Sequence, residues 1–268
     1  FAATYRAGKT PNPCLVCNPA IKFGALLAHA RRLGAGALAT GHYARIAISD
    51  SACRLLQGRD AAKDQSYFLA FLRPDQLRQA RFPLGELRKT DVQRMARQIG
   101  LQPLAAGESQ DVCFVRGGRY EDFLMQTVGF RPQSGDIVDP QGRVLGRHPG
   151  LHRFTVGQRR GINCPAAEPY YVLRLEPSAN RLVVGHKGDT YSRDCRVENI
   201  QWITEPSAAS MNVHTRIRYR HRAAESVVTL ENAHAATVRF RQAQSAVTPG
   251  QGAVFFRGEE VLGGGFIV

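Results

Sequence analysis

The feature that most constrains the fold of this chain is a change in its hydrophobic pattern near residue 117. Before that point, apolar residues recur at helical spacing or in short continuous runs, which is typical of an α/β domain. After it, short alternating strands are separated by turn sequences, which is typical of β-rich domains. A chain of 268 residues is long enough for two or three domains. We therefore predict an α/β region over 1–116, a small central β-rich region over 117–190 and a C-terminal β-barrel over 191–268.

The first region is expected to place helices beside a buried parallel strand. Asn18-Pro19 resembles a helix N-cap followed by proline, and it predicts a helix that ends at Leu33. The apolar run 35–40 is typical of a parallel strand buried on both faces. It ends at Gly41-His42-Tyr43, and the carboxyl ends of such strands are where α/β sheets bind ligands. A second helix is predicted over 90–100.

The central region is predicted to contain a short helix around Tyr120 and two hairpins. The turn sequences Asp139-Pro140-Gln141-Gly142 and Pro177-Ser178-Ala179-Asn180 each lie between two short apolar segments. From about residue 191 onward, short alternating strands recur with turn signals between them. This spacing predicts the small β-barrel.

The net charge of +14 favours polyanionic partners, because each phosphate that a protein neutralises releases condensed counterions. Much of the excess lies in 216–222 and 239–241, where Arg alternates with Ile, Tyr and Phe. Such alternation predicts strands with one face buried and the other facing phosphate. Nucleic acid is therefore the favoured partner, although a basic surface can also serve solubility alone.

Six cysteines are too few for a disulfide scaffold in a chain of this length. The sequence opens at Phe1 with no secretory signal and no long apolar run, so we expect an internal fragment of a longer cytoplasmic protein. In a reducing compartment, Cys14-Leu15-Val16-Cys17 is a redox, metal or catalytic candidate. Cys17 directly precedes the predicted helix, whose dipole favours the thiolate, the reactive form of cysteine. The alternative is a buried cysteine that serves as a small apolar residue.

Cys113 is the second candidate, in the strand-like segment 109–115. Sulfur transfer needs two thiols, one carrying a persulfide and the other attacking it. A single sequence does not bring Cys113 to Cys17, and a core cysteine is the alternative role. Cys14, Cys17 and Cys113 could form three corners of a zinc or iron–sulfur site, but no second C-x-x-C or nearby His completes four ligands. We therefore predict no metal site and leave the iron–sulfur option open.

A set of short motifs follows in order from near residue 5 to the C-terminus. The motifs are Thr10-Pro11-Asn12-Pro13-Cys14-Leu15-Val16-Cys17-Asn18, Ile21-Lys22-Phe23, Ala39-Thr40-Gly41-His42-Tyr43, Lys63-Asp64-Gln65-Ser66-Tyr67-Phe68-Leu69, Phe82-Pro83-Leu84-Gly85-Glu86-Leu87, Gly150-Leu151-His152, Thr155-Val156-Gly157-Gln158-Arg159-Arg160-Gly161, Thr248-Pro249-Gly250-Gln251 and Leu262-Gly263-Gly264-Gly265. Each is weak alone, but the ordered set resembles the tRNA-specific 2-thiouridylases. The resemblance implies an α/β + β fold class, in which part of a PP-loop (adenine-nucleotide α-hydrolase-like) domain precedes the two β-rich domains.

The resemblance also implies a role for individual positions. Cys17 matches the family nucleophile, and Cys113 matches the cysteine that carries the persulfide. Gly41 matches an ATP contact at the end of its strand. Three positions match the loop that meets the target base: Asn12, Pro13 and Cys14. The other positions that match tRNA contacts are His42, Lys63, Asp64, Gln65, Arg218, Tyr219 and Gln251.

The implied reaction replaces the C2 oxygen of the wobble uridine, U34, by sulfur in tRNAs with Lys, Glu and Gln anticodons. ATP, with Mg²⁺, would adenylate that oxygen, and the persulfide on Cys113 would then attack C2 as AMP departs. Cys17 would attack the sulfur–sulfur bond, which leaves a Cys17–Cys113 disulfide. A persulfide sulfur donor protein is an implied partner, and the target base would have to leave its stack.

The chain departs from the family pattern at two points. The family's Ser-Gly-Gly-Val-Asp-Ser-Ser loop does not occur in residues 1–268. Because such a loop holds nucleotide phosphates, we expect these residues alone neither to bind ATP well nor to thiolate tRNA. Some relatives carry Asp where this chain has Cys14. The alternative function is a non-catalytic basic RNA-binding protein, and an amidotransferase-type ligase would fit the first region but not the paired cysteines.

Overall fold

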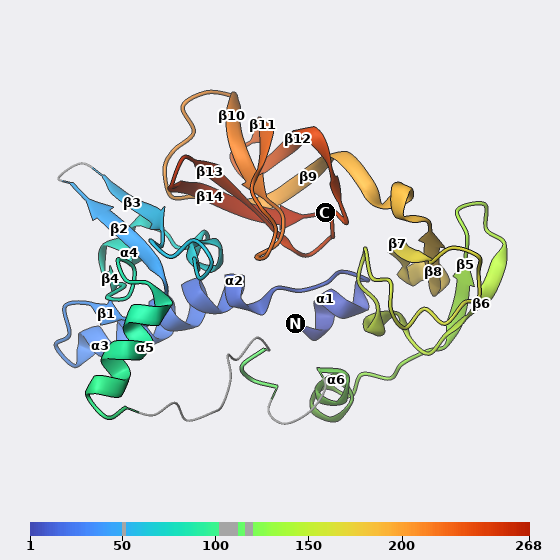
Figure 1. The fold of residues 1–268 in the computed structure, drawn as a ribbon, viewed down its shortest axis with the longest axis horizontal. Helices are drawn as coiled ribbons and strands as arrows, with labels where there is room; N and C mark the ends of the chain where they lie inside the picture. Colours follow the sequence, from blue (N-terminus) through green and yellow to red (C-terminus); the bar gives the residue numbers. More distant parts are fainter. Residues whose placement is uncertain (50–51, 102–111, 116–119) are drawn as a thin grey trace.

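The computed structural model describes residues 1–49, 52–101, 112–115 and 120–268. The first region forms one side of the molecule, the barrel lies above it and the central sheet lies beyond α1 (Figure 1). The elements of the first region are α1 (Ala2–Arg6), α2 (Pro13–Cys17), the π-helical η1 (Asn18–Leu26), α3 (Leu27–Arg32), β1 (Leu38–Ala39), β2 (Ala44–Ile48), β3 (Cys53–Gln57), the 3₁₀ turn η2 (Ser66–Leu69), α4 (Pro74–Arg78), β4 (Ala80–Arg81) and α5 (Lys89–Gln98).

The continuous helical stretch α2–η1–α3, residues 13–32, is called the cysteine helix below. It begins at Pro13, because proline suits the first helical position, and Asn12 is its N-cap. The prediction that this helix begins at Asn18 was wrong. Cys17 therefore lies one turn inside the helix and not ahead of it, so the argument from the helix N-terminus does not apply to its thiol.

Pro19 does not break the cysteine helix because the segment that contains it is π-helical. A proline inside an α-helix removes one hydrogen bond and clashes with the preceding turn, and a π-helix relieves this by widening the backbone. The side-chain amide of buried Gln76 donates to the carbonyl oxygens of Pro19 at 2.7 Å and Phe23 at 3.0 Å. These bonds from α4 satisfy the widened backbone from outside.

The α/β character of the first region is confirmed by the parallel pair β1–β4, in which Leu38 lies beside Ala80. β1 is shorter than the predicted run 35–40, and it ends just before Gly41-His42-Tyr43. α5 matches the second predicted helix. No helix in the described ranges has both the length and the apolar content needed to cross a membrane.

The central region contains both predicted hairpins. Its elements are α6 (Tyr120–Val128), β5 (Gly135–Val138), β6 (Val144–His148), the 3₁₀ turns η3 (Leu151–Arg153) and η4 (Pro177–Ala179), β7 (Tyr171–Glu176), β8 (Arg181–Gly185) and η5 (Lys187–Thr190). β5–β6 and β7–β8 are antiparallel, and β5 pairs with β8 in parallel to give the order β6-β5-β8-β7. Asp139 accepts the N–H groups of Gln141 and Arg143, which closes the first predicted turn.

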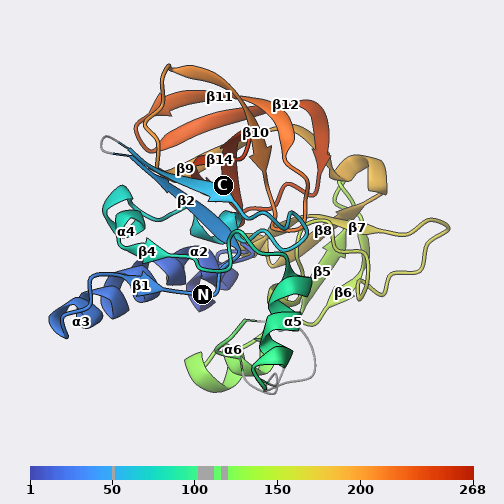
Figure 2. The ribbon, with the colours of Figure 1, turned by 60° about the vertical axis from the view of Figure 1, so that its left-hand side comes forward.

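Between residues 191 and 267, all of which the structure describes, six strands close into the predicted barrel (Figure 2). They are β9 (Tyr191–Trp202), β10 (Ser210–Arg216), β11 (Ala224–Asn232), β12 (Ala235–Ser245), β13 (Gly252–Arg257) and β14 (Glu260–Ile267). β14 also pairs with β3, so the β2–β3 hairpin of the first region extends the barrel sheet. The first region and the barrel are thus joined by backbone hydrogen bonds.

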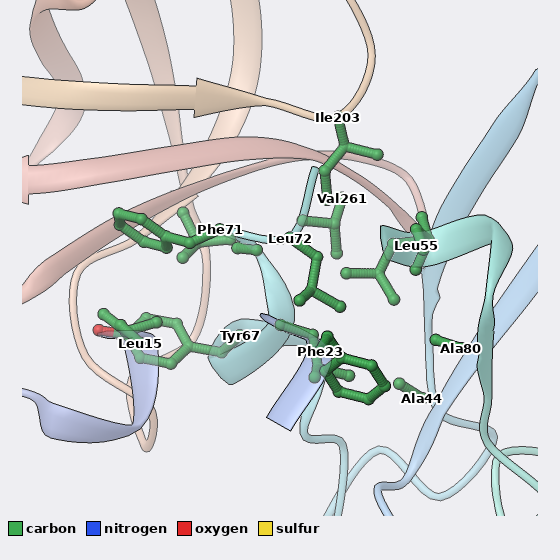
Figure 3. Close-up of a cluster of buried hydrophobic side chains, with 14 of the residues drawn as sticks. Leu15, Phe23, Ala44, Leu55, Tyr67, Phe71, Leu72, Ala80, Ile203 and Val261 are labelled. Atoms are coloured by element: carbon green, nitrogen blue, oxygen red, sulfur yellow. The ribbon is translucent and has the colours of Figure 1, made fainter. Parts of the chain in front are cut away.

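One hydrophobic core also spans these two regions. Figure 3 shows Leu15 of the cysteine helix and Tyr67 of η2 in the same cluster as Ile203 and Val261 from the barrel. Leu15, Tyr67 and Val261 are fully buried. Because burial of large side chains is the main favourable term in folding, this shared core fixes the cysteine helix against the barrel.

Two strand predictions in functional segments were wrong. β10 ends at Arg216, and residues 217–221 form bends and turns, so the alternation in 216–222 reflects a loop. Cys113 lies in a turn within 112–115, while 109–111 lie outside the described residues. In β12, by contrast, Arg239 and Arg241 are exposed on either side of buried Phe240, as a strand requires.

Candidate functional site

The structure brings the predicted cysteines toward one another. Cys14 and Cys113 are exposed, Cys17 is half-buried, and all three are free thiols. Desolvation of the sulfur raises the pKa of Cys14, and the neighbouring thiols of Cys113 and Cys17 add to this, whereas the Lys22 ammonium opposes it. Cys113 therefore lies within electrostatic reach of the cysteine helix, although 99 residues separate it from Cys14 along the chain (113 − 14).

The turn that carries Cys113 is held by aromatic contacts rather than by a sheet. The ring of Phe114 lies 5.2 Å from that of Phe1 and 5.3 Å from that of Phe123, between centroids. Tyr5 of α1 stacks on Tyr120 of α6 at 5.3 Å. Such edge-to-face and stacked pairs each stabilise a contact by about 0.5–1.5 kcal/mol. These contacts hold the segment 112–115 against Phe1 at the N-terminus and against α6. Figure 1 shows the N-terminus close to α1 and the cysteine helix.

The loop that leads into the cysteine helix, residues 10–12, is held from three sides. The N–H of Thr10 donates to the carbonyl oxygen of Pro249 in the barrel at 2.9 Å. The hydroxyl of Thr10 donates to that of Thr155 in the central region at 3.1 Å. The side chain of Asn12 hydrogen-bonds the hydroxyl of Tyr67. Pro13, at the helix start, follows directly.

His42 lies in a chain of polar contacts that reaches the cysteine helix. Its Nε2 lies 3.5 Å from Nζ of Lys22, and its Nδ1 lies 2.7 Å from Oγ1 of Thr40. Because an ammonium only donates, Nε2 accepts and Nδ1 of the neutral ring carries the proton toward Thr40. Burial lowers the pKa of His42 to about 4, and the Lys22 charge contributes. His42 is thus a neutral group that directs Lys22 beside Cys14.

This environment predicts a pH-dependent stability. In the unfolded chain His42 binds a proton near pH 6.5, whereas in the folded protein it does so only near pH 4. The contribution of neutral His42 to the free energy of unfolding is fully present above pH 6.5. It is lost as the pH falls toward 4, by up to about 3 kcal/mol. Urea unfolding should show that the free energy of unfolding falls less between pH 7.5 and pH 4.5 in His42→Gln than in the parent protein. His29→Gln, which alters an exposed histidine of α3, is the control, and an equal loss in the His42 and His29 variants would contradict the prediction.

The predicted RNA-contacting segment 63–65 is a turn in which one side chain faces inward. The Asp64 carboxylate is buried and pairs with Arg216 of the barrel at 3.1 Å. It also accepts bonds from the N–H groups of Gly58 and Ser66. Gln65 accepts the N–H of Tyr43 at 3.0 Å, while the half-buried Lys63 lies beside them. Asp64 thus acts within the protein and presents no carboxylate to a ligand.

Three further residues predicted to contact RNA are engaged in internal contacts. The Arg218 guanidinium donates to the carbonyl oxygen of Val156 at 2.7 Å and to the hydroxyl of Thr248. The Gln251 amide donates to the carbonyl oxygen of Thr10 at 3.0 Å. The ring of the half-buried Tyr219 packs on Phe68 at 4.3 Å between centroids. These residues join the barrel to the other two regions.

Gly41 lies at the exposed end of β1, and a Cβ there would meet only Leu84 at 3.7 Å. The backbone at this point is accessible, as a nucleotide contact requires. A triphosphate also needs a Gly-rich loop, and none of the family type occurs in residues 1–268. The residues present therefore do not fit a complete ATP site. Within the described ranges, no group of three His, Cys, Asp or Glu side chains is arranged to hold a metal ion.

Sequence reasoning did not single out several residues that organise this site. Lys22, Thr10, Tyr67, Thr155 and Thr248 each make contacts that link the cysteine helix or its leading loop to another element. All five stand inside the short motifs of the sequence. The motifs were therefore a usable signal, but the partner of each side chain is distant along the chain.

Three family models match the chain in succession. A model described as tRNA methyl transferase HUP domain matches residues 1–117, one described as tRNA methyl transferase PRC-barrel domain matches 121–186, and one described as aminomethyltransferase beta-barrel domain matches 192–267. With the parallel β1–β4 pair and the closed barrel, these matches confirm the predicted fold class.

Several curated proteins are similar to this chain over its whole length. The tRNA-specific 2-thiouridylase MnmA of Desulfosudis oleivorans is 51% identical over 267 residues, which cover 100% of this chain and 75% of that protein. Proteins of the same name from Acidithiobacillus ferrooxidans and Chlorobium chlorochromatii are 47% and 45% identical, and 100% of this chain matches 76% of each.

Proposed function

The chain belongs to the family of tRNA-specific 2-thiouridylases, and from that premise we propose that it receives a uridine of tRNA and transfers sulfur to C2 of the base. The observation that carries the proposal is the position of the turn 112–115, which Phe114 holds against Phe1 and Phe123, with Cys113 in electrostatic reach of Cys14. Shared core packing and the aromatic contacts of Phe114 hold the cysteine helix and this turn in place. Sulfur transfer needs two thiols that can reach each other, and the proposal assigns these roles to Cys17 and Cys113.

In the proposed reaction, Cys113 carries a persulfide and Cys17 is the nucleophile. On a base whose C2 oxygen has been made a leaving group, the outer persulfide sulfur bonds to C2 and the C2–oxygen bond breaks. The Cys17 thiolate then attacks Sγ of Cys113, and the electron pair of the broken sulfur–sulfur bond leaves with the sulfur on C2. The products are 2-thiouridine and a Cys17–Cys113 disulfide, which an external dithiol reduces. That last requirement favours the cytoplasm as the compartment.

Activation of the C2 oxygen is assigned to ATP with Mg²⁺, and Gly41 is the residue proposed to border the nucleotide. Because residues 1–268 contain no phosphate loop of the family type, we propose that they do not activate the base by themselves. An iron–sulfur cluster on Cys14, Cys17 and Cys113 is the open alternative for these thiols. The sulfur reaches Cys113 from a persulfide donor protein.

The proposed substrate is tRNA with a Lys, Glu or Gln anticodon, modified at the wobble uridine U34. Exposed Arg239 on β12 provides positive charge for the phosphates, and Lys63 is proposed as a further tRNA contact. Asn12, Pro13, Cys14 and His42 are proposed to line the path of the base. The net charge of +14 supports a large electrostatic contribution to the affinity of the protein for tRNA.

The proposal is tested by thiolation of tRNA. The full-length protein that contains these residues, incubated with ATP, Mg²⁺, a persulfide donor and tRNA of the Lys anticodon, should form 2-thiouridine at the wobble position, as measured by mass spectrometry of nucleosides. Residues 1–268 alone should form none, yet should bind the tRNA with an affinity that falls steeply with salt. Salt-dependent binding without any product from the full-length protein would instead favour the non-catalytic RNA-binding alternative.

A further inference from the structure

The barrel turn 248–252 is hydrogen-bonded directly to the loop 10–12. The Thr10 N–H donates to the carbonyl oxygen of Pro249, and the Gln251 side-chain amide donates back to the carbonyl oxygen of Thr10, at 2.9 and 3.0 Å. The same amide lies 3.5 Å from the carbonyl oxygen of Pro11. The barrel thus binds both the N–H and the carbonyl oxygen of Thr10. Figure 1 shows the link between α1 and α2 running beneath the barrel.

The turn is shaped for this close approach. Gly250 has a φ of +89°, and a Cβ at this position would lie only 2.8 Å from the carbonyl oxygen of Thr10. The N–H of Gly250 donates to the carbonyl oxygen of Ile267, and the N–H of Ile267 donates to the carbonyl oxygen of Gln251. The backbone of the turn is therefore fixed to β14, so the side chain of Gln251 is aimed at the loop by the sheet.

The central region reaches the same point through Arg218 and Thr248. Arg218 bonds both the carbonyl oxygen of Val156 and the hydroxyl of Thr248, which is itself buried. Thr155, which precedes Val156 in the chain, accepts a hydrogen bond from the hydroxyl of Thr10. On the other side, the hydroxyl of Tyr67 donates to the carbonyl oxygen of Gly252 while it contacts the Asn12 side chain. All three regions thus meet at the loop that begins the cysteine helix.

We propose that Gln251 is a positioning residue, which with the turn 248–252 sets the geometry of loop 10–12 and of the cysteine helix behind it. The inference rests on the proposed function for the role of that helix. Gln251 then acts on sulfur transfer through the loop and not by touching RNA. A residue that contacted phosphate would hold an accessible donor, whereas this amide is already directed at two backbone carbonyls.

Hydrogen exchange of the RNA-free protein tests whether Gln251 holds the loop 10–12. In Gln251→Leu, the Thr10 amide should exchange about three- to tenfold faster, the effect of one lost neutral hydrogen bond. Amides in β9 and β12 should keep their rates, which would show that the barrel remains folded. Gly250→Ala should accelerate the same Thr10 amide. The matched control is Gln244→Leu, which removes an amide bonded to Gln242 within β12 and should leave Thr10 unaffected. An unchanged Thr10 amide in both test variants would overturn the proposal.

A second measurement separates positioning from RNA contact in the full-length protein. For Gln251→Leu, kcat for thiolation should fall at least about threefold, while the Kd for tRNA and its salt dependence stay unchanged. A weaker Kd with a smaller salt slope and an unchanged kcat would overturn the proposal in favour of an RNA contact. If the parent protein forms no 2-thiouridine, the proposed function fails, and the exchange rate of Thr10 still decides whether Gln251 holds the loop.

Discussion

Serine in place of Cys17 or Cys113 is expected to abolish thiolation by the full-length protein while tRNA binding stays nearly unchanged. A serine oxygen can neither carry the persulfide sulfur nor attack a sulfur–sulfur bond at neutral pH. The rate should fall by at least about a thousandfold, as loss of a covalent nucleophile does elsewhere. The measurement is 2-thiouridine per protein over time, beside the Kd for tRNA. Cys17 is half-buried and Cys113 exposed, so neither substitution should disturb the core.

Two further variants sharpen this result. Cys164→Ser changes a half-buried thiol of the central region, far along the chain from the cysteine helix, and should retain full activity. Cys14→Ser should show whether Cys14 lines the path of the base or takes part in catalysis. The substitution leaves the proposed persulfide carrier, Cys113, and the proposed nucleophile, Cys17, in place. If Cys17→Ser and Cys113→Ser each kept the parent rate, the two-thiol chemistry would have to be abandoned.

Alanine in place of Asp64 is expected to lower the free energy of unfolding by about 3–5 kcal/mol. The substitution leaves the Arg216 charge, whose side chain is 13% exposed, without its carboxylate. It also removes the acceptor of the Gly58 and Ser66 N–H groups and of the Ser66 hydroxyl. Breaking a buried ion pair from one side is costly because the remaining charge stays desolvated. Urea unfolding followed by circular dichroism provides the measurement.

The control for Asp64 is an exposed ion pair of the same residue types. Asp75 pairs with Arg73 at 2.9 Å on α4, with 62% of the Asp75 side chain exposed. Asp75→Ala should change the free energy of unfolding by no more than about 1 kcal/mol, because solvent screens such pairs. A cost for Asp64→Ala as small as that for Asp75→Ala would show that Asp64 does not join the first region to the barrel.

These tests bear on how residues of a short motif are interpreted. Lys63, Asp64 and Gln65 stand together in the sequence, yet Asp64 turns inward to Arg216 and Gln65 to the N–H of Tyr43. Similarly, the family resemblance implied RNA contacts for Gln251 and Arg218. Their donors are directed at Thr10 and Val156. Residue type shows what a side chain can bind, and the fold decides which partner it meets.

Local chemistry in the sequence determined most of the elements of this protein. The α/β character before residue 117, both central hairpins and the closed barrel follow from hydrophobic period and turn residues, which act between near neighbours. The start of the cysteine helix did not follow, because Gln76, 57 residues from Pro19, supports the π-helical turn that lets the helix pass that proline. Cys113 likewise lies in a turn whose position is set by the rings of Phe1 and Phe123. The candidate site depends on such contacts between distant residues, and their geometry exists only once the three regions have packed together.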